Sequence, residues 1–220
     1  MEQRSSFQAA ADAKLAWIVG GSLLAASAVV GLVLQPVTAL VSGGDLVASI
    51  LFASGLVVFA IGLRGSGSVT ARRPLGTAAL LVLAAWTLLV SILGVALFST
   101  DLPLGALLGF GYVDSLIRFA AALVAVVQIA RAGTIRRPWN WAPGWLLAAA
   151  TALWLIQQAL GASGGQSAGT VAPLVWTLEG IVNFGGPVFL GVVAIVLANR
   201  SSREQTVPIY PQSRRDDPSS

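Results

Sequence analysis

Residues 112–145 read YVDSLIRFAAALVAVVQIARAGTIRRPWNWAPGW. The stretch begins with an apolar run, Ser115 to Ala130, which holds Arg118 near its start. A basic turn and a cluster of tryptophans follow, and these residues are Arg131, Arg136, Arg137, Trp139, Trp141 and Trp145. Because Lys and Arg mark the cytoplasmic side of membrane helices and Trp gathers at the interfaces, the pattern predicts a helix that crosses a membrane. The helix would leave the membrane through a basic, aromatic-lined face.

The composition of the whole chain agrees with this interpretation. Of the 220 residues, 56% are hydrophobic and only 10% are charged, and the mean hydropathy is +0.82. A soluble domain carries about 25% charged residues, so the composition predicts an integral membrane protein. The chain contains neither cysteine nor histidine. Disulfides, thiolate nucleophiles, imidazole bases and the metal sites built on these side chains are therefore excluded.

The hydropathy pattern predicts an all-α, polytopic membrane protein with six transmembrane helices. A helix needs about 20 apolar residues to cross a hydrocarbon core roughly 30 Å thick. The predicted spans are residues 15–34, 46–63, 75–98, 115–130, 143–160 and 174–198, which together make up a transmembrane domain over residues 15–198. Residues 1–14 are predicted to be a cytoplasmic amino-terminal segment, and the polar residues 199–220 a disordered cytoplasmic tail.

Two apolar stretches leave alternatives open. Ala26-Ser27-Ala28 has the form of a signal-peptide cleavage site, but the apolar run continues to Leu34, which favours a first span that is retained. Residues 104–113 are apolar and only ten residues long. This is too short to cross, so the sequence predicts a surface-lying or re-entrant segment there.

The distribution of basic residues predicts the orientation. With both termini in the cytoplasm, 12 of the 13 basic residues lie on the inner side, and the outer loops hold none. The outer side carries Asp45, Asp101 and Asp114 instead. Arginine greatly outnumbers lysine, and Ala, Gly and Val are abundant, which is typical of a GC-rich bacterial genome. We therefore expect a multi-pass protein of a bacterial cytoplasmic membrane.

A set of polar residues near the outer face is the candidate site. A charged residue inside a span costs roughly 2.5 to 3.5 kcal/mol on insertion scales, so it tends to face a partner or a wet cavity. The sequence predicts a ligand or ion site between the last three spans, made of Arg118, Glu179, Asn183, Gln157 and Gln158. The alternatives are that Arg118 reaches out to the outer phosphates, or that it forms an ion pair that holds the helices together. Its partner would be Glu179, or Asp114 four residues earlier on the same helix face.

The last predicted span contains Gly185, Gly186 and Pro187. Proline has no backbone N–H to donate to the carbonyl four residues earlier, which here belongs to Asn183. The sequence therefore predicts a helix kink at these three residues. Broken helices with freed carbonyls are a common way for transporters to bind ions, although kinks also occur in membrane helices without such a role.

Two functions follow as hypotheses. Catalytic residues, cofactors and metals are not predicted, because neither paired carboxylates nor a nucleophile with its base lies within the spans. The first hypothesis is a non-enzymatic accessory or scaffold subunit of a membrane assembly, motivated by small residues such as Ser27 and Gly31 at helix-packing spacing. The second is a small transporter or channel with an outward-facing polar site. The expected partners are the lipid bilayer and either a protein subunit or further copies of the chain. Nucleic acid is not expected, because the basic residues lie in turns between spans.

Overall fold

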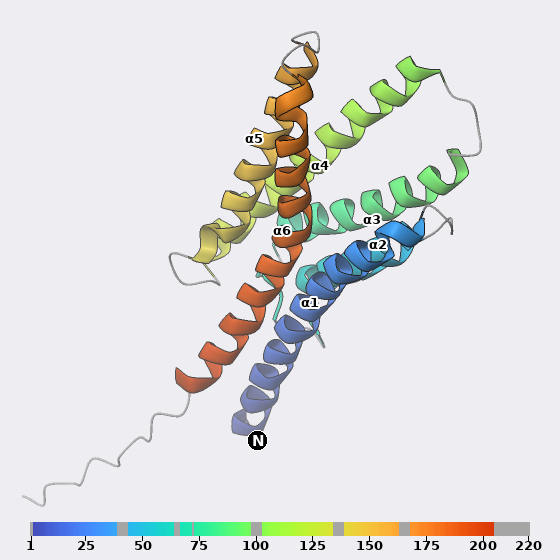
Figure 1. The fold of residues 1–220 in the computed structure, drawn as a ribbon. Coiled ribbons are helices and arrows are strands. Elements are labelled where there is room, and N and C mark those ends of the chain that lie inside the picture. The colour runs from blue at the N-terminus through green and yellow to red at the C-terminus, as the bar shows by residue number, and fades with distance from the viewer. Residues whose placement is uncertain are drawn as a thin grey trace, which may run out of the picture.

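The computed structural model describes residues 2–38, 44–63, 67–71, 73–97, 103–133, 139–162 and 168–204. The regular elements of this part of the chain are all helices, which confirms the all-α prediction (Figure 1). They are α1 (Glu2–Thr38), α2 (Gly44–Ile61), α3 (Pro74–Leu97), α4 (Leu104–Ala132), the short 3₁₀ turn η1 (Trp139–Trp141), α5 (Ala142–Ala162) and α6 (Ala168–Glu204).

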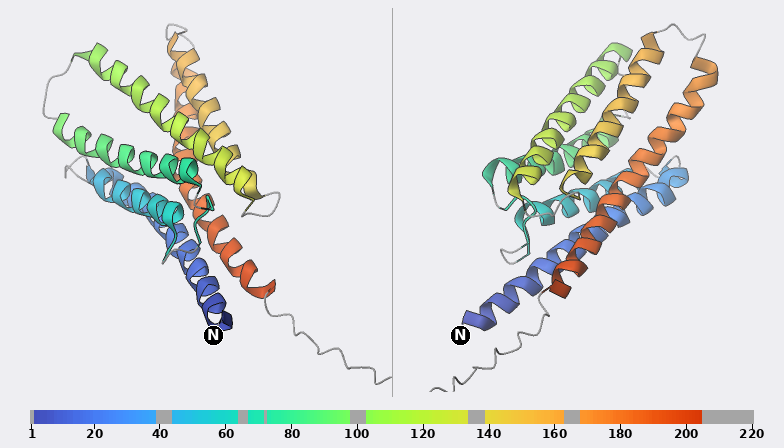
Figure 2. Two further views of the ribbon diagram at one scale, coloured as in Figure 1. Left: turned by 180° about the vertical axis from the view of Figure 1, so that it is seen from behind. Right: turned by 90° about the vertical axis from the view of Figure 1, so that its left-hand side faces the viewer.

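The six α-helices form a closed ring. Each helix packs against the next one along the chain, and α6 packs extensively against α1 to complete the circle. The amino-terminal end of α1 and the carboxyl-terminal end of α6 lie at the same end of the bundle (Figures 1 and 2). We call this the basal end, which also holds the α2–α3 loop and η1, and we call the opposite end apical.

Four of the helices are long and apolar enough to cross a membrane. These segments are Ala10–Leu34, Pro74–Gly94, Gly105–Ala132 and Pro173–Arg200, in α1, α3, α4 and α6. The apolar segment of α2, Asp45–Ile61, is shorter, and α5 is not among the four. The polar pair Gln157 and Gln158 near the carboxyl-terminal end of α5 lowers the hydropathy of that helix. The described helices are those of a multi-pass membrane protein.

The apolar residues 104–113 do not form a separate element. They are the first turns of α4, which continues without interruption to Ala132, so the prediction of a surface-lying or re-entrant segment is wrong. The sequence suggested a break because Asp114 and Arg118 interrupt the apolar run. In the structure these two side chains pair with each other along one helix face, so their charges do not end the helix.

Two helices extend beyond the apolar runs that predicted them. α1 begins at Glu2 and takes in most of the predicted amino-terminal segment, and α6 runs from Ala168 to Glu204. Hydropathy marks only the part of a helix that suits lipid, and polar residues at either end can continue the same hydrogen-bonded spiral. The predicted tail beyond Glu204 lies outside the described residues.

Adjacent glycines in α1 bring two neighbouring helices close. A Cβ atom at Gly20 would lie 3.0 Å from the ring of Phe59 in α2, and one at Gly21 would lie 2.6 Å from the carbonyl oxygen of Gly191 in α6. Small residues at such crossings let helix backbones approach closely in lipid. α1 is therefore held from two sides, by α2 and by α6.

The loop between α2 and α3 folds back into the basal end of the ring. The backbone N–H of Val69 donates to the carbonyl of Phe59 at 3.1 Å, and the Ser68 hydroxyl donates to the carbonyl of Ala60 at 2.8 Å. Thr70 is 0% exposed, and its hydroxyl bonds to those of Ser68 and Thr77 at 3.1 and 3.0 Å. These bonds replace the water that a loop normally uses, so the loop packs as part of the core.

Candidate functional site

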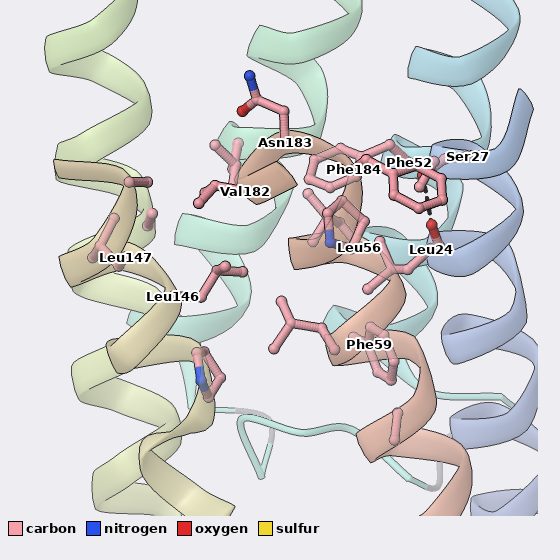
Figure 3. Close-up of a pocket in the computed structure, with 18 of the residues that line it drawn as sticks. Leu24, Ser27, Phe52, Leu56, Phe59, Leu146, Leu147, Val182, Asn183 and Phe184 are labelled. Atoms are coloured by element: carbon pink, nitrogen blue, oxygen red, sulfur yellow. Dashed lines mark hydrogen bonds between the residues drawn. The ribbon is translucent and has the colours of Figure 1, made fainter. Parts of the chain in front are cut away.

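A cavity of about 1100 Å³ lies inside the ring. All six α-helices contribute to its wall, and Val69 of the α2–α3 loop and Trp139 of η1 line it as well. Figure 3 shows side chains of α1, α2, α5 and α6 gathered around it; those labelled are Leu24, Ser27, Phe52, Leu56, Phe59, Leu146, Leu147, Val182, Asn183 and Phe184. The cavity is therefore a property of the whole ring and not of one pair of helices.

Most of the wall is apolar. Trp17 stacks edge-to-face on Phe59, with ring centroids 6.2 Å apart, and both residues line the cavity. Three hydroxyl-bearing residues, Ser27, Ser49 and Thr87, also line it. Ser27 and Thr87 donate to backbone carbonyls in their own helices at 2.7 and 2.8 Å, and Ser49 bonds to the hydroxyl of Ser91 at 2.7 Å. These hydroxyls are already satisfied within the protein, so they add little polarity to the wall.

The polar part of the wall is formed by a few residues. Arg118 of α4 and Asn183 of α6 line the cavity, and Asp45, at the apical start of α2, does so too. Figure 3 shows Asn183 apart from the labelled apolar side chains, with its amide pointing away from them. Within the described part of the chain, the Asn183 amide has no hydrogen-bond partner. It is therefore available to a molecule in the cavity.

Arg118 belongs to a small polar cluster that joins α3 and α4. Its Nε lies 2.7 Å from Oδ1 of Asp114, and the indole Nε1 of Trp86 donates to the same oxygen at 2.8 Å. The bond to Asp114 uses only one of the five N–H groups of the guanidinium. Among the described residues, none bonds to the two terminal nitrogens. A cavity-lining arginine thus keeps unused hydrogen-bond donors although its charge is paired.

A second polar cluster joins α4, α5 and α6. Nε2 of Gln157 donates to Oε2 of Glu179 at 2.5 Å. The hydroxyl of Tyr112 donates to Oε1 of Gln158 at 3.0 Å, and the Tyr112 ring packs edge-on against Trp154. Hydrogen bonds between membrane helices stabilise their association. Together with the Trp86–Asp114 bond, these contacts tie α3, α4, α5 and α6 in series.

The structure divides the residues of the predicted polar site. Arg118 and Asn183 line the cavity, whereas Glu179, Gln157 and Gln158 are outside its wall and bond to their neighbours. Of the two predicted partners for Arg118, the structure shows the contact with Asp114, and Glu179 bonds to Gln157 instead. The predicted convergence of five side chains is thus replaced by two that face the cavity and three that link helices.

The residues of the predicted kink lie inside α6. Pro187 lines the cavity, and α6 changes direction about halfway along its length (Figure 1). A Cβ atom at Gly186 would lie 2.9 Å from Leu146 of α5, while Gly185 has open space around it. The glycine at 186 therefore permits α5 and α6 to approach each other beside the proline.

Sequence reasoning missed two features of the site. Trp86 was not expected to touch Asp114, because one sequence does not show which face of α3 meets α4. Asn140, in η1, is only 7% exposed, and its side-chain oxygen has no partner among the described residues. A polar residue between two tryptophans at the end of a basic turn reads as an interface residue, so its burial gave no signal.

Comparisons with protein-family models, with curated proteins and with solved structures found no match to this chain. The argument for function therefore rests on the cavity and on the residues that line it. Among the described residues, no group of three acidic side chains lies close enough together to hold a metal ion.

Proposed function

We propose that this chain is a non-enzymatic membrane protein that binds and carries an apolar or amphipathic molecule in its central cavity. The observation behind the proposal is the cavity of about 1100 Å³, to which all six α-helices contribute. Binding sites for small molecules are typically about 300 to 1000 Å³ in volume, mostly apolar, with a few polar groups that fix orientation. Arg118 and Asn183 are such groups here.

The proposal includes the topology. All six helices cross the cytoplasmic membrane of a bacterium, with the basal end and both termini in the cytoplasm. The positive-inside distribution supports this orientation, because the basic residues flank the basal helix ends. α2 and α5 are shorter or less apolar than the other four, but both belong to the closed ring. A ring of this kind shields their polar positions from lipid.

Transport of an apolar molecule is favoured over conduction of ions. An ion pathway needs polar groups along its length, either rings of carbonyls or rings of charged side chains. Around this cavity the polar groups are few, and the basal part of the wall includes the buried side chain of Val69 from the α2–α3 loop. The wall resembles the interior of a lipid-binding pocket more closely than a pore.

The hypothesis of an accessory or scaffold subunit loses the observation that motivated it. Ser27 is buried, and its hydroxyl bonds to the carbonyl of Leu24. Gly31 faces Ala48 of α2, at 3.6 Å from the position of a Cβ atom. These small residues pack helices within the chain, so they do not form a free surface for a partner. Association with another subunit or with further copies stays a prediction.

Photolabelling tests the proposed binding. The protein is reconstituted in lipid nanodiscs and labelled with a long-chain alkyl diazirine, and labelled residues are identified by mass spectrometry. We expect label on cavity residues such as Trp17 and Leu190, reduced by excess unlabelled long-chain competitor. Label confined to lipid-facing residues such as Leu116 and Trp176, and insensitive to competitor, would overturn the proposal.

A pair of neighbouring alanines in α5 supplies a matched control. Ala150 lines the cavity, whereas Ala149 is exposed and lies outside its wall. Ala150→Phe should occupy part of the cavity and reduce the competitor-sensitive labelling, while Ala149→Phe places the same side chain outside it. Equal effects of the two substitutions would show that the label does not report on the cavity.

A further inference from the structure

We propose that the bound molecule carries an uncharged head group with a hydrogen-bond acceptor, such as an ester or ketone oxygen. The free edge of the Arg118 guanidinium donates to this oxygen, and Asp114 keeps the pair electrically neutral. This inference rests on the proposed function and specifies the ligand class of the same cavity. It follows from the donors that face the cavity and from the charges around them.

The first step is the supply of donors. Arg118 lines the cavity and uses its Nε for Asp114, at 2.7 Å. Its two terminal nitrogens carry four further N–H groups in a fixed plane and have no acceptor capacity. Asn183 adds amide N–H groups on the same wall. A head group with acceptor oxygens satisfies these donors, whereas a pure hydrocarbon leaves them without partners in an apolar setting.

The second step is the charge balance. The carboxylate of Asp114 already compensates Arg118, and Trp86 holds that carboxylate in place through a 2.8 Å bond. Asp45 also lines the cavity, and Glu179 lies nearby on α6, outside the wall. An anionic head group would therefore enter a site that has no spare positive charge. Its desolvation would not be repaid by a net attraction.

The third step excludes a cationic head group. Among the described residues that line the cavity, Arg118 is the only cation. A positively charged head group at the free donors would meet the guanidinium at close range, and like charges repel more strongly in a low-dielectric site. Both signs of charge are thus disfavoured, and a neutral acceptor remains.

The matched competitors are methyl palmitate, palmitate, hexadecyltrimethylammonium and hexadecane, tested against the diazirine probe in nanodiscs. Each competitor is measured on the wild-type chain and on the variants below. Comparing the same competitor across variants cancels its partitioning into the bilayer. In the wild type, after correction for partitioning, methyl palmitate should displace the probe at lower concentration than the other three. A wild-type preference for palmitate or for the ammonium compound would overturn the proposal.

The decisive variant is Asp114→Asn. The asparagine oxygen still accepts from Trp86, but the positive charge of Arg118 is no longer compensated. Palmitate should gain on methyl palmitate by at least about tenfold, which corresponds to 1.4 kcal/mol. Trp86→Phe is the control, because it removes the indole donor and keeps the ion pair, and the ratio should then stay as in the wild type.

The double variant Asp114→Asn with Arg118→Met tests the donors themselves. It removes both charges together, so the site stays neutral while the guanidinium N–H groups are lost. Methyl palmitate should lose roughly three- to tenfold of its advantage over hexadecane, the worth of a typical hydrogen bond. Should Asp114→Asn fail to fold, Arg118→Lys serves instead, because a single ammonium bound to Asp114 has no free planar edge, and the same loss is expected.

The two levels of the proposal fail in different ways. An absence of competitor-sensitive labelling in the wild type would overturn the cavity function itself. Saturable labelling with an unchanged palmitate to methyl palmitate ratio in Asp114→Asn would overturn only the neutral head group. A lipid extract of freshly purified protein separates the sources of the ligand: a resident membrane lipid appears in the extract, whereas a ligand taken from solution binds only when added.

Discussion

At the scale of single residues, the close crossing of α1 and α6 depends on two glycines. A Cβ atom at Gly21 would lie 2.6 Å from the carbonyl oxygen of Gly191, and both residues are buried. Backbone atoms cannot turn aside as the end of a flexible side chain can. An added methyl group must therefore push the two helices apart.

Gly191→Ala should consequently destabilise the protein by about 1 to 3 kcal/mol, the usual cost of overpacking. Gly185→Ala is the control in the same helix, because nothing lies within 4 Å of its Cβ position, and alanine is the better helix former. Thermal unfolding in detergent, followed by circular dichroism, measures both. Equal melting temperatures for the two variants would contradict the close contact.

The bond between Gln157 and Glu179 makes a second prediction at this scale. Glu179→Gln keeps an acceptor oxygen for Gln157, so we expect little loss of stability. Glu179→Leu leaves the amide of Gln157 unpaired and should cost about 1 to 3 kcal/mol. The same melting experiment distinguishes them. Because Glu179 is outside the cavity wall, Glu179→Gln should also leave competitor-sensitive photolabelling unchanged.

At the scale of elements, the α2–α3 loop is held by its backbone conformation as well as by its hydrogen bonds. Gly67 has φ +81°, and a Cβ atom there would lie 2.8 Å from Cα of Ala13 in α1. Gly133, which ends α4, has φ +66°, but its Cβ position is open. Both positions require a left-handed backbone, and only one of them is also crowded.

This pair separates strain from contact. Gly133→Ala should cost about 1 to 2 kcal/mol for the left-handed conformation alone. Gly67→Ala should cost this and, in addition, about 1 to 3 kcal/mol for the displacement of α1. Melting temperatures of the two variants give the comparison. If Gly67→Ala were no worse than Gly133→Ala, the loop would not press against α1 as the structure has it.

The sequence predicted the elements better than their contacts. Five of the six apolar runs match helices closely, and the pairing of Asp114 with Arg118 needed only helical spacing. The bonds from Trp86 to Asp114 and from Gln157 to Glu179 join different helices, and one sequence contains no register between them. The cavity was hidden for another reason. In a membrane helix, Leu24 on the cavity wall and Val33 on the outside have the same polarity, so periodicity does not separate them.

At the scale of the whole molecule, the orientation in the membrane is open to direct measurement, because the native chain has no cysteine. We expect Gly105→Cys, at the apical start of α4, to react with a membrane-impermeant maleimide on intact cells. Ala71→Cys, in the basal α2–α3 loop, should react only after the membrane is opened. The reverse pattern would invert the topology, and labelling of both on intact cells would refute an even number of crossings between them and the termini.

The closure of the ring by α1 and α6 has a consequence for how the protein is made. The other helix contacts join neighbours in the chain, so they can form as each pair of helices leaves the ribosome. The contact between α1 and α6 joins the first helix synthesised to the last. Until α6 arrives, the glycine face of α1 stays open to lipid and the cavity has no complete wall. The binding site therefore comes into existence only with the final step of biosynthesis, and a chain cut short before α6 would contain most of the lining residues without the space they enclose.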